Sequence, residues 1–132
     1  MRAFVTALVL FVVTVTAVGV NTAVLAKRFE KIDGYLSGLP TDKQTYEKMS
    51  ERERAAAEAL LLGTAALWKK DEAYRYCTMR HTVCMEFDKA LDAGISFYQS
   101  GGYDEYLAQI TDAKLTVGHL RFDEGLSLGN IL

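Results

Sequence analysis

The chain has 132 residues, with 15 Lys and Arg, 17 Asp and Glu, two Cys, two His and a single Pro. This length fits one compact domain, and a hydrophobic share of 50% excludes an intrinsically disordered chain. A formal net charge of -2 argues against a nucleic-acid-binding protein, and two cysteines are too few for a disulfide-rich scaffold.

The first predicted element is a helix that spans a membrane. No charged residue occurs between Ala3 and Ala26. At about 1.5 Å per residue, this stretch reaches about 36 Å as a helix and exceeds the ~30 Å hydrocarbon core of a bilayer. Its threonines can return their hydroxyls to the carbonyl one turn earlier, and Asn21 lies near its end, at the headgroup level. We therefore predict a transmembrane signal-anchor over residues 1–26 and a separate helical domain over residues 27–132.

A cleavable secretory signal is the alternative interpretation of the same stretch. Arg2 supplies a basic start and Val24-Leu25-Ala26 resembles a small-residue cleavage site, which makes the mature protein a secreted helical domain. The apolar region of a signal peptide usually has about 7–15 residues. The greater length of this stretch favours an uncleaved anchor.

Two opposed signals bear on the orientation. Arg2 and the amino terminus carry two positive groups, whereas Lys27, Arg28 and Lys31 carry three just beyond the segment, which favours a cytoplasmic C-terminal domain. An apolar segment that begins at residue 3 is instead typical of a signal-anchor that exports the chain after it. We expect the second arrangement: a single-pass protein of the cell membrane with an extracytoplasmic C-terminal domain.

The rest of the chain is predicted to be helical, because apolar residues recur three or four positions apart and no alternating stretch indicates a strand. The first helix ends near Gly38 and Pro40. A second starts at the Thr41-x-x-Gln44 capping box and reaches Trp68. A third runs from Asp71 to the break at Ser100-Gly101-Gly102, and a fourth starts at Asp104. The fold class is therefore all-α: an N-terminal transmembrane helix followed by a small antiparallel helical bundle.

Each predicted helix has one apolar face that indicates the core. Gly125 and Gly129 argue against a long continuation of the fourth helix, and we expect the apolar side chains of the C-terminal tail to dock onto the bundle. The expected core residues are Phe29, Ile32, either Tyr35 or Leu36, and Leu39; Tyr46, Met49, Ala56, Leu60, Thr64 and Leu67; Cys77, His81, Cys84, Phe87, Leu91, Ile95 and Tyr98; and Tyr106, Ile110, Ala113, Val117 and Leu120. The docking tail residues are Leu126, Leu128, Ile131 and Leu132.

A family resemblance rests on Trp68, on His81, on the segment FYQSGGYDEYLAQI, on His119-Leu120 and on the ending LSLGNIL. With these features the sequence resembles the bacterial family catalogued as domain of unknown function 4363, whose short members combine an N-terminal hydrophobic segment with a helical remainder. The resemblance implies a membrane-anchored helical protein without a known activity. Cys77 and Cys84 depart from the family pattern, so the resemblance implies nothing for them.

Two cysteines and two histidines are the candidates for a metal- or thiol-dependent site. Cys77, His81 and Cys84 form a C-x₃-H-x₂-C pattern on one predicted helical face, and His119 on the next helix is a fourth candidate ligand. Thiolate and imidazole are zinc ligands, but structural zinc sites usually use a tighter cysteine pair. Free cysteines are often core residues. The ~10 Å expected between their Cα atoms exceeds the ~7 Å limit for a disulfide. We expect no metal and no cofactor, and keep this site as the alternative.

No catalytic motif occurs in the chain. It has no phosphate-binding glycine loop, no H-E-x-x-H and no G-x-S-x-G, and its paired acids lie at helix ends, where the helix dipole favours them. Its seven tyrosines fit either the edge of the core or a binding groove. We predict that the protein is no enzyme but a protein–protein interaction module at the membrane surface, with the lipid bilayer and another protein as partners and no nucleic acid.

Overall fold

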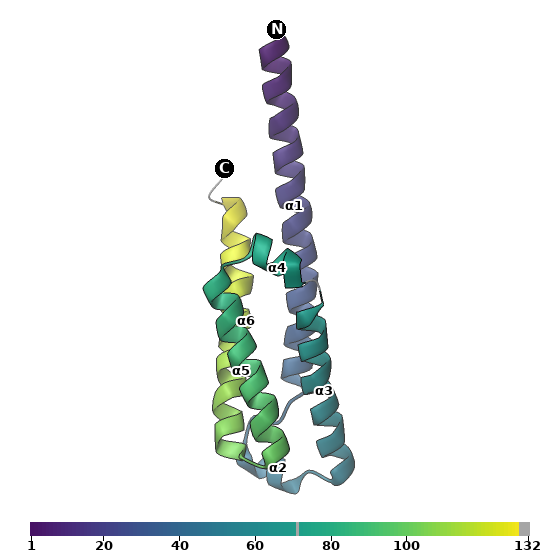
Figure 1. Cartoon of the computed structure of the whole chain (residues 1–132). Helices are drawn as coiled ribbons and strands as arrows, with labels where there is room; N and C mark the ends of the chain where they lie inside the picture. The colour runs from purple at the N-terminus through teal and green to yellow at the C-terminus, as the bar shows by residue number, and fades with distance from the viewer. Residues whose placement is uncertain (71, 130–132) are drawn as a thin grey trace.

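The computed structural model describes residues 1–70 and 72–129, except the side chains of residues 78 and 122–129, and these residues form six helices and no strand. Figure 1 shows a bundle of long helices with the N-terminal part of α1 projecting beyond it. The predicted all-α fold with a long N-terminal apolar helix is confirmed. The helices are α1 (Arg2–Ser37), α2 (Lys43–Lys48), α3 (Glu51–Lys69), α4 (Glu72–Thr78), α5 (His81–Ser100) and α6 (Tyr103–Gly129).

Helix α1 is continuous over 36 residues and joins the apolar segment to the bundle without a break. The hydroxyls of Thr6, Thr14 and Thr16 donate to the carbonyls four residues earlier, at 2.8–3.0 Å, as predicted. The prediction fails at Thr22, whose buried hydroxyl has no hydrogen-bond partner among the described residues. The helix ends at Gly38, whose N–H bonds back to the carbonyls of Tyr35 and Leu36. Residue 26, the predicted domain boundary, therefore lies inside a helix that serves both parts of the chain.

The second predicted helix is in fact two helices, α2 and α3, separated at Met49. Asp42, not Thr41, caps α2, and its carboxylate accepts from the backbone N–H of Thr45 at 2.8 Å. A new capping box formed by Ser50 and Glu53 then starts α3. This S-x-x-E pattern is present in the sequence, and a second start signal of this kind indicates a second helix.

The third predicted helix is also two helices, α4 and α5, because Arg80 has an extended backbone between them. No glycine or proline marks this break. Arg75 and Met79 of the α4 segment are both buried, so packing of this short segment against the bundle sets the break. Cys77 and Cys84 consequently lie on different helices, and the single face predicted for Cys77, His81 and Cys84 is wrong.

A tight turn joins α5 to α6. Gly101 has φ 79°, in the left-handed region, and the N–H of Gly102 donates to the carbonyl of Phe97 at 2.9 Å. Helix α6 then continues to Gly129, so the expectation that Gly125 prevents a long helix is wrong. A helical glycine costs only about 1 kcal/mol relative to alanine, so a single glycine need not end a helix. The docking predicted for Leu126, Leu128, Ile131 and Leu132 lies outside the described residues and side chains.

The core lies between the four long helices, with the main contacts joining α1 to α3 and α6, and α5 to α3 and α6. The predicted face of α6 is confirmed, and so are Phe29, Ile32 and Leu36 of α1 and Cys84, Phe87, Leu91 and Tyr98 of α5. His81 and Cys77 are exposed. The buried residues of α6 are Tyr106, Ile110, Ala113, Val117 and Leu120.

Of the predicted face of α3, Thr64 is buried, Leu60 and Leu67 are partly buried against the core, and Ala56 is exposed. The buried residues are Ala57, Leu61, Thr64 and Trp68, one position beyond the expected Ala56, Leu60 and Leu67. The predicted face assumes a single helix that continues from Tyr46 through Met49. Since the chain is extended at Met49, the helical phase starts afresh at Ser50.

Candidate functional site

The structure disperses the four candidate ligands. Cys77 on α4 is exposed and Cys84 on α5 is buried. His81 and His119 are both exposed, and the His81 ring packs on Tyr76 with 4.5 Å between ring centroids. Within residues 1–70 and 72–129, no three His, Cys, Asp or Glu side chains are grouped so as to hold a metal ion. The alternative of a metal- or thiol-dependent site therefore finds no support there.

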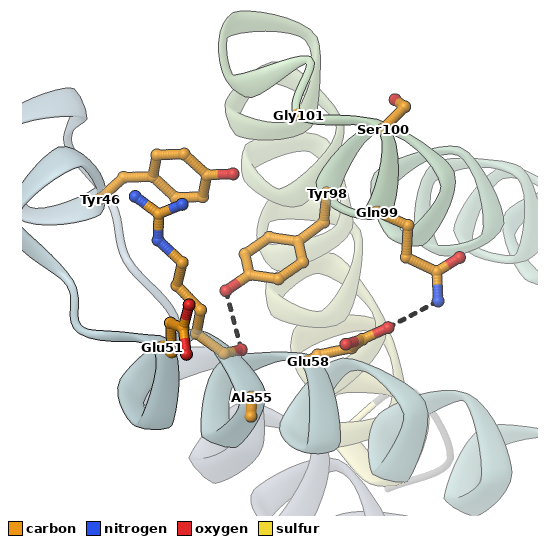
Figure 2. A pocket seen from close by; sticks show the side chains of 9 residues that line it. Tyr46, Glu51, Ala55, Glu58, Tyr98, Gln99, Ser100 and Gly101 are labelled. Atoms are coloured by element: carbon orange, nitrogen blue, oxygen red, sulfur yellow. Dashed lines mark hydrogen bonds between the residues drawn. The ribbon is translucent and has the colours of Figure 1, made fainter.

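A groove of about 660 Å³ opens at the end of the bundle opposite the projecting part of α1. Figure 2 shows its two walls: the start of α3 with Glu51 and Glu58, and the end of α5 with Tyr98 and Gln99. Arg54 of α3 also lines it. The Tyr98 hydroxyl donates to the carbonyl of Arg54 at 3.0 Å, and Gln99 Nε2 donates to Glu58 Oε1 at 2.7 Å. These two bonds join the α3 wall of the groove to the α5 wall.

Four tyrosines pack beside this groove, where the sequence suggested either a groove lining or a core edge. Tyr46 lies 5.7 Å from Tyr98 and 4.5 Å from Tyr103 between ring centroids, and the Arg54 guanidinium lies 5.2 Å from the Tyr46 ring. Tyr106 is fully buried behind them, and burial strongly raises the pKa of its hydroxyl. Both interpretations apply: Tyr46 and Tyr98 line the groove, while Tyr106 belongs to the core.

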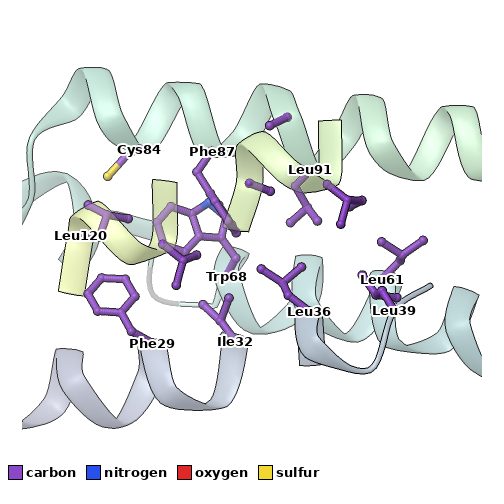
Figure 3. Packing of buried hydrophobic residues seen from close by; sticks show 14 of the residues in the cluster. Phe29, Ile32, Leu36, Leu39, Leu61, Trp68, Cys84, Phe87, Leu91 and Leu120 are labelled. Carbon is purple, nitrogen blue, oxygen red and sulfur yellow. The ribbon is translucent and has the colours of Figure 1, made fainter. Parts of the chain in front are cut away.

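At the other end of the bundle, Trp68 is the centre of an aromatic and charged cluster. Figure 3 shows its indole among Phe29, Ile32 and Phe87. The indole Nε1 donates to Asp88 Oδ1 at 2.6 Å. The Arg75 guanidinium lies 4.1 Å from the Trp68 ring centroid, and its Nη1 is 4.0 Å from Asp88 Oδ2. Sequence reasoning missed Arg75, because nothing in Tyr74-Arg75-Tyr76 distinguishes a buried arginine from a surface one.

Cys84 belongs to the same cluster and is a core residue. Burial raises the pKa of its thiol, and the nearby Arg75 only partly opposes this effect. A neutral, buried thiol is a poor nucleophile and a poor metal ligand. Cys84 therefore acts as a small apolar core residue, and its surroundings do not indicate a reactive thiol.

The N-terminal part of α1 presents apolar side chains in every direction. Residues 3–17 are all exposed, and the most apolar 18-residue window of the helix has a mean hydropathy of 2.5 with none of its residues buried. By length and composition, α1 is able to cross a membrane. Bulky members of this surface include Phe4, Leu8, Leu10, Phe11, Val12 and Val13.

Helix α4 meets α1 where the exposed apolar surface ends. The Tyr74 hydroxyl donates to the side-chain carbonyl of Asn21, and the Arg28 guanidinium lies 5.8 Å from the Tyr74 ring centroid. An apolar groove of about 760 Å³ runs along α1 from Val12 and ends at Tyr74. The amide predicted to face headgroups is thus already bonded within the protein.

No protein-family model, no curated protein and no solved structure matches this chain. The resemblance to the family of domain of unknown function 4363 stays a prediction from the sequence.

Proposed function

We propose that the protein is a single-pass membrane-anchored helical module that binds another protein at the membrane surface. The observation that carries the proposal is the division of α1 into two parts within one helix. Residues 3–17 are exposed and have only threonines as polar side chains, whereas Leu25, Phe29, Ile32 and Leu36 are fully buried in the bundle. In water, so large an apolar surface is unfavourable by about 25 cal/mol per Å². A bilayer removes that cost.

The same division supports an anchor that is not cleaved. Cleavage after Ala26 removes Leu25, which packs fully buried in the bundle, and leaves a new terminus inside the helix. Removing a buried leucine side chain typically destabilises a protein by about 2–5 kcal/mol. The secreted form is therefore less favourable than the anchored form.

The groove beside Tyr46 and Tyr98 is the surface that we assign to the protein partner. It combines aromatic faces with the charged side chains of Glu51, Arg54 and Glu58. Partner-binding surfaces favour tyrosine and arginine of this kind. Its position at the far end of an antiparallel bundle presents it away from the lipid, and tethering to a bilayer raises the effective concentration of neighbouring membrane proteins.

Membrane insertion is tested by carbonate extraction and by flotation with vesicles. We expect the wild-type chain to stay with the membrane and the double variant Val12→Arg/Val13→Arg to be released. Each arginine at the centre of a span costs about 2.5–3.5 kcal/mol on the insertion scale. The control is Leu115→Arg, which places arginine on an exposed apolar position of α6 outside the span. Release of the wild-type chain contradicts the anchor.

We propose an extracytoplasmic bundle, and a reporter fused after Leu132 tests it. Alkaline phosphatase is active only outside the cytoplasm, so it should be active at this position, whereas a fluorescent reporter that folds in the cytoplasm should stay dark. The opposite pair of results assigns the bundle to the cytoplasm. Sequencing the mature N-terminus in the same cells distinguishes Met1 from a start at Lys27.

Partner binding is tested by a photoreactive residue at Gln99, in the groove, compared with one at Thr111, which is exposed on α6 outside it. In native membranes, we expect one discrete protein adduct at Gln99 and none at Thr111. Equal labelling at both positions contradicts the groove as the partner surface.

A further inference from the structure

We propose that the bundle rests directly on the phospholipid headgroup layer, with α4 lying inside that layer. This inference depends on the proposed membrane span and adds a contact that the span alone does not require. An anchored domain connected by a long stalk has no lipid contact of its own. Three features indicate that this bundle does contact the lipid. They are the length of the exposed part of α1, the point at which the bundle begins to cover α1, and the residues of α4.

The exposed apolar length of α1 is close to the thickness of the hydrocarbon core and slightly below it. Arg2 marks one end, and Asn21, the first amide after it, marks the other. The intervening residues, 3–20, form about 27 Å of helix at about 1.5 Å per residue, against a hydrocarbon core of ~30 Å. With Arg2 in one headgroup layer, Asn21 lies at the boundary of the other.

The bundle begins to cover α1 at that same boundary. Asn21 and Thr22 are half-buried, and Leu25 is fully buried little more than one turn later. Figure 1 shows α4 beside α1 at this level, and the C-terminal part of α6 reaching beyond α4 toward the N-terminal end of α1. Because the covered part starts where the hydrocarbon ends, no free stalk separates the bundle from the lipid.

The residues at this level suit an interface. Tyr74 and Tyr76 of α4 are half-buried, so part of each residue is exposed, while the Tyr74 hydroxyl donates to the Asn21 side-chain carbonyl. Lys27 and Lys70 are exposed nearby. Tyrosine rings concentrate at the headgroup level of membrane proteins, and lysine side chains extend from there toward phosphate and water. The partner is therefore the phospholipid headgroup itself.

Cys77 offers a direct probe, because it is exposed on α4 whereas Cys84 is buried and protected from labelling. The full chain, labelled at Cys77 with a small environment-sensitive fluorophore, is reconstituted in phosphatidylcholine vesicles that carry nitroxide quenchers at the headgroup or deep in the acyl chains. The matched control carries the label at the groove end of the bundle, as Ser100→Cys in a Cys77→Ser background. Flotation of the same vesicles reports the span independently.

We expect headgroup nitroxides to remove most of the Cys77 fluorescence, deep nitroxides to remove much less, and the label at Ser100→Cys to be unaffected by either. Equal, weak quenching at both positions in protein that floats overturns the contact with the headgroups and leaves the anchor intact. Stronger quenching by deep nitroxides at Cys77 also overturns it, because α4 then lies in the hydrocarbon. Protein that fails to float refutes the span and the contact together.

Discussion

Arg75 carries its charge into a nearly closed part of the core, with only 1% of its side chain exposed. The indole of Trp68 provides a face for the guanidinium, and Asp88 provides the opposite charge. Its Nε and Nη1 have no hydrogen-bond partner within the described part of the chain. A buried ion is tolerated only when such contacts replace its hydration, so the cluster of Trp68, Arg75 and Asp88 acts as one unit.

Removing Arg75 is therefore expected to destabilise the bundle. We expect Arg75→Ala to lower the free energy of unfolding by about 3 kcal/mol, at the low end of the range for a broken buried pair, because Asp88 keeps 25% of its side chain exposed. Urea unfolding in detergent, followed by circular dichroism, measures the change. The exposed Lys89→Ala should stay within about 0.5 kcal/mol of the wild type. Equal midpoints for the two variants would contradict this role of Arg75.

Alanine substitutions at Gly101 and Gly118 distinguish the cost of backbone strain from the cost of a steric clash. A Cβ at Gly101 or at Gly118 meets no heavy atom within 4 Å among the described residues, but Gly101 has φ 79° whereas Gly118 is helical. We expect Gly101→Ala to destabilise by about 1–2 kcal/mol, the cost of the left-handed conformation for a residue with a side chain. Gly118→Ala should stabilise by up to about 1 kcal/mol. Thermal unfolding of both variants in parallel measures the opposite signs.

At the scale of the elements, side-chain caps start two consecutive helices: Asp42 caps α2, and Ser50 caps α3. The carboxylate of Glu53 accepts from the backbone N–H and the hydroxyl of Ser50, both at 2.7 Å. These bonds lower the pKa of Glu53 below its usual value of 4.5. Since Asp42 has a lowered pKa for the same reason at the start of α2, both caps require ionised carboxylates.

The capping box makes the stability of the bundle depend on acidity. A carboxyl whose pKa is lower in the folded state stabilises the fold above its unfolded pKa and loses that contribution as the pH falls through the folded pKa. We expect Glu53→Gln, which keeps the capping geometry without titrating, to be less stable than the wild type at pH 7. Its deficit should shrink as the pH falls below about 4.5. A deficit that is the same at pH 7 and pH 3, measured by urea unfolding, contradicts the link to ionisation.

At the scale of the whole molecule, α1 joins an exposed apolar segment to the core of the bundle. The part up to residue 17 has no contact that buries it, and the part from Leu25 to Leu36 completes the core together with α3 and α6. The bundle is thus built around the end of the helix whose apolar part is able to cross a membrane. Any tilt of that apolar part is transmitted to the bundle, because no loop separates them.

A shortened chain tests this division. A chain that begins at Gly19 keeps Asn21 and every buried residue of α1, so we expect it to remain folded in solution without detergent. In that chain, Leu25→Ala should cost about 2–5 kcal/mol, because the leucine is fully buried. The neighbouring Val24→Ala, at a position with 40% exposure, should cost clearly less. Circular dichroism with urea unfolding provides the comparison, and an unfolded shortened chain refutes the autonomy of the bundle.

The sequence by itself determined the features that depend on local composition or on one uninterrupted period. The apolar part of α1 follows from 24 uncharged residues, the core face of α6 follows from its regular spacing, and the turn at Gly101 follows from a residue that accepts the left-handed conformation. These properties need no knowledge of neighbouring helices. For the groove, the sequence indicates only that tyrosines are available. It does not predict which helices bring them together.

Only the tertiary structure decided where α4 ends, which face of α3 is buried and how Arg75 is accommodated. The break at Arg80 has no glycine, proline or side-chain cap, so it is set by the burial of Met79 and Arg75 against the bundle. The same break separated Cys77 from Cys84 and removed the predicted ligand face. A helical period can be traced only while the helix continues, and contacts distant in sequence determine where it stops.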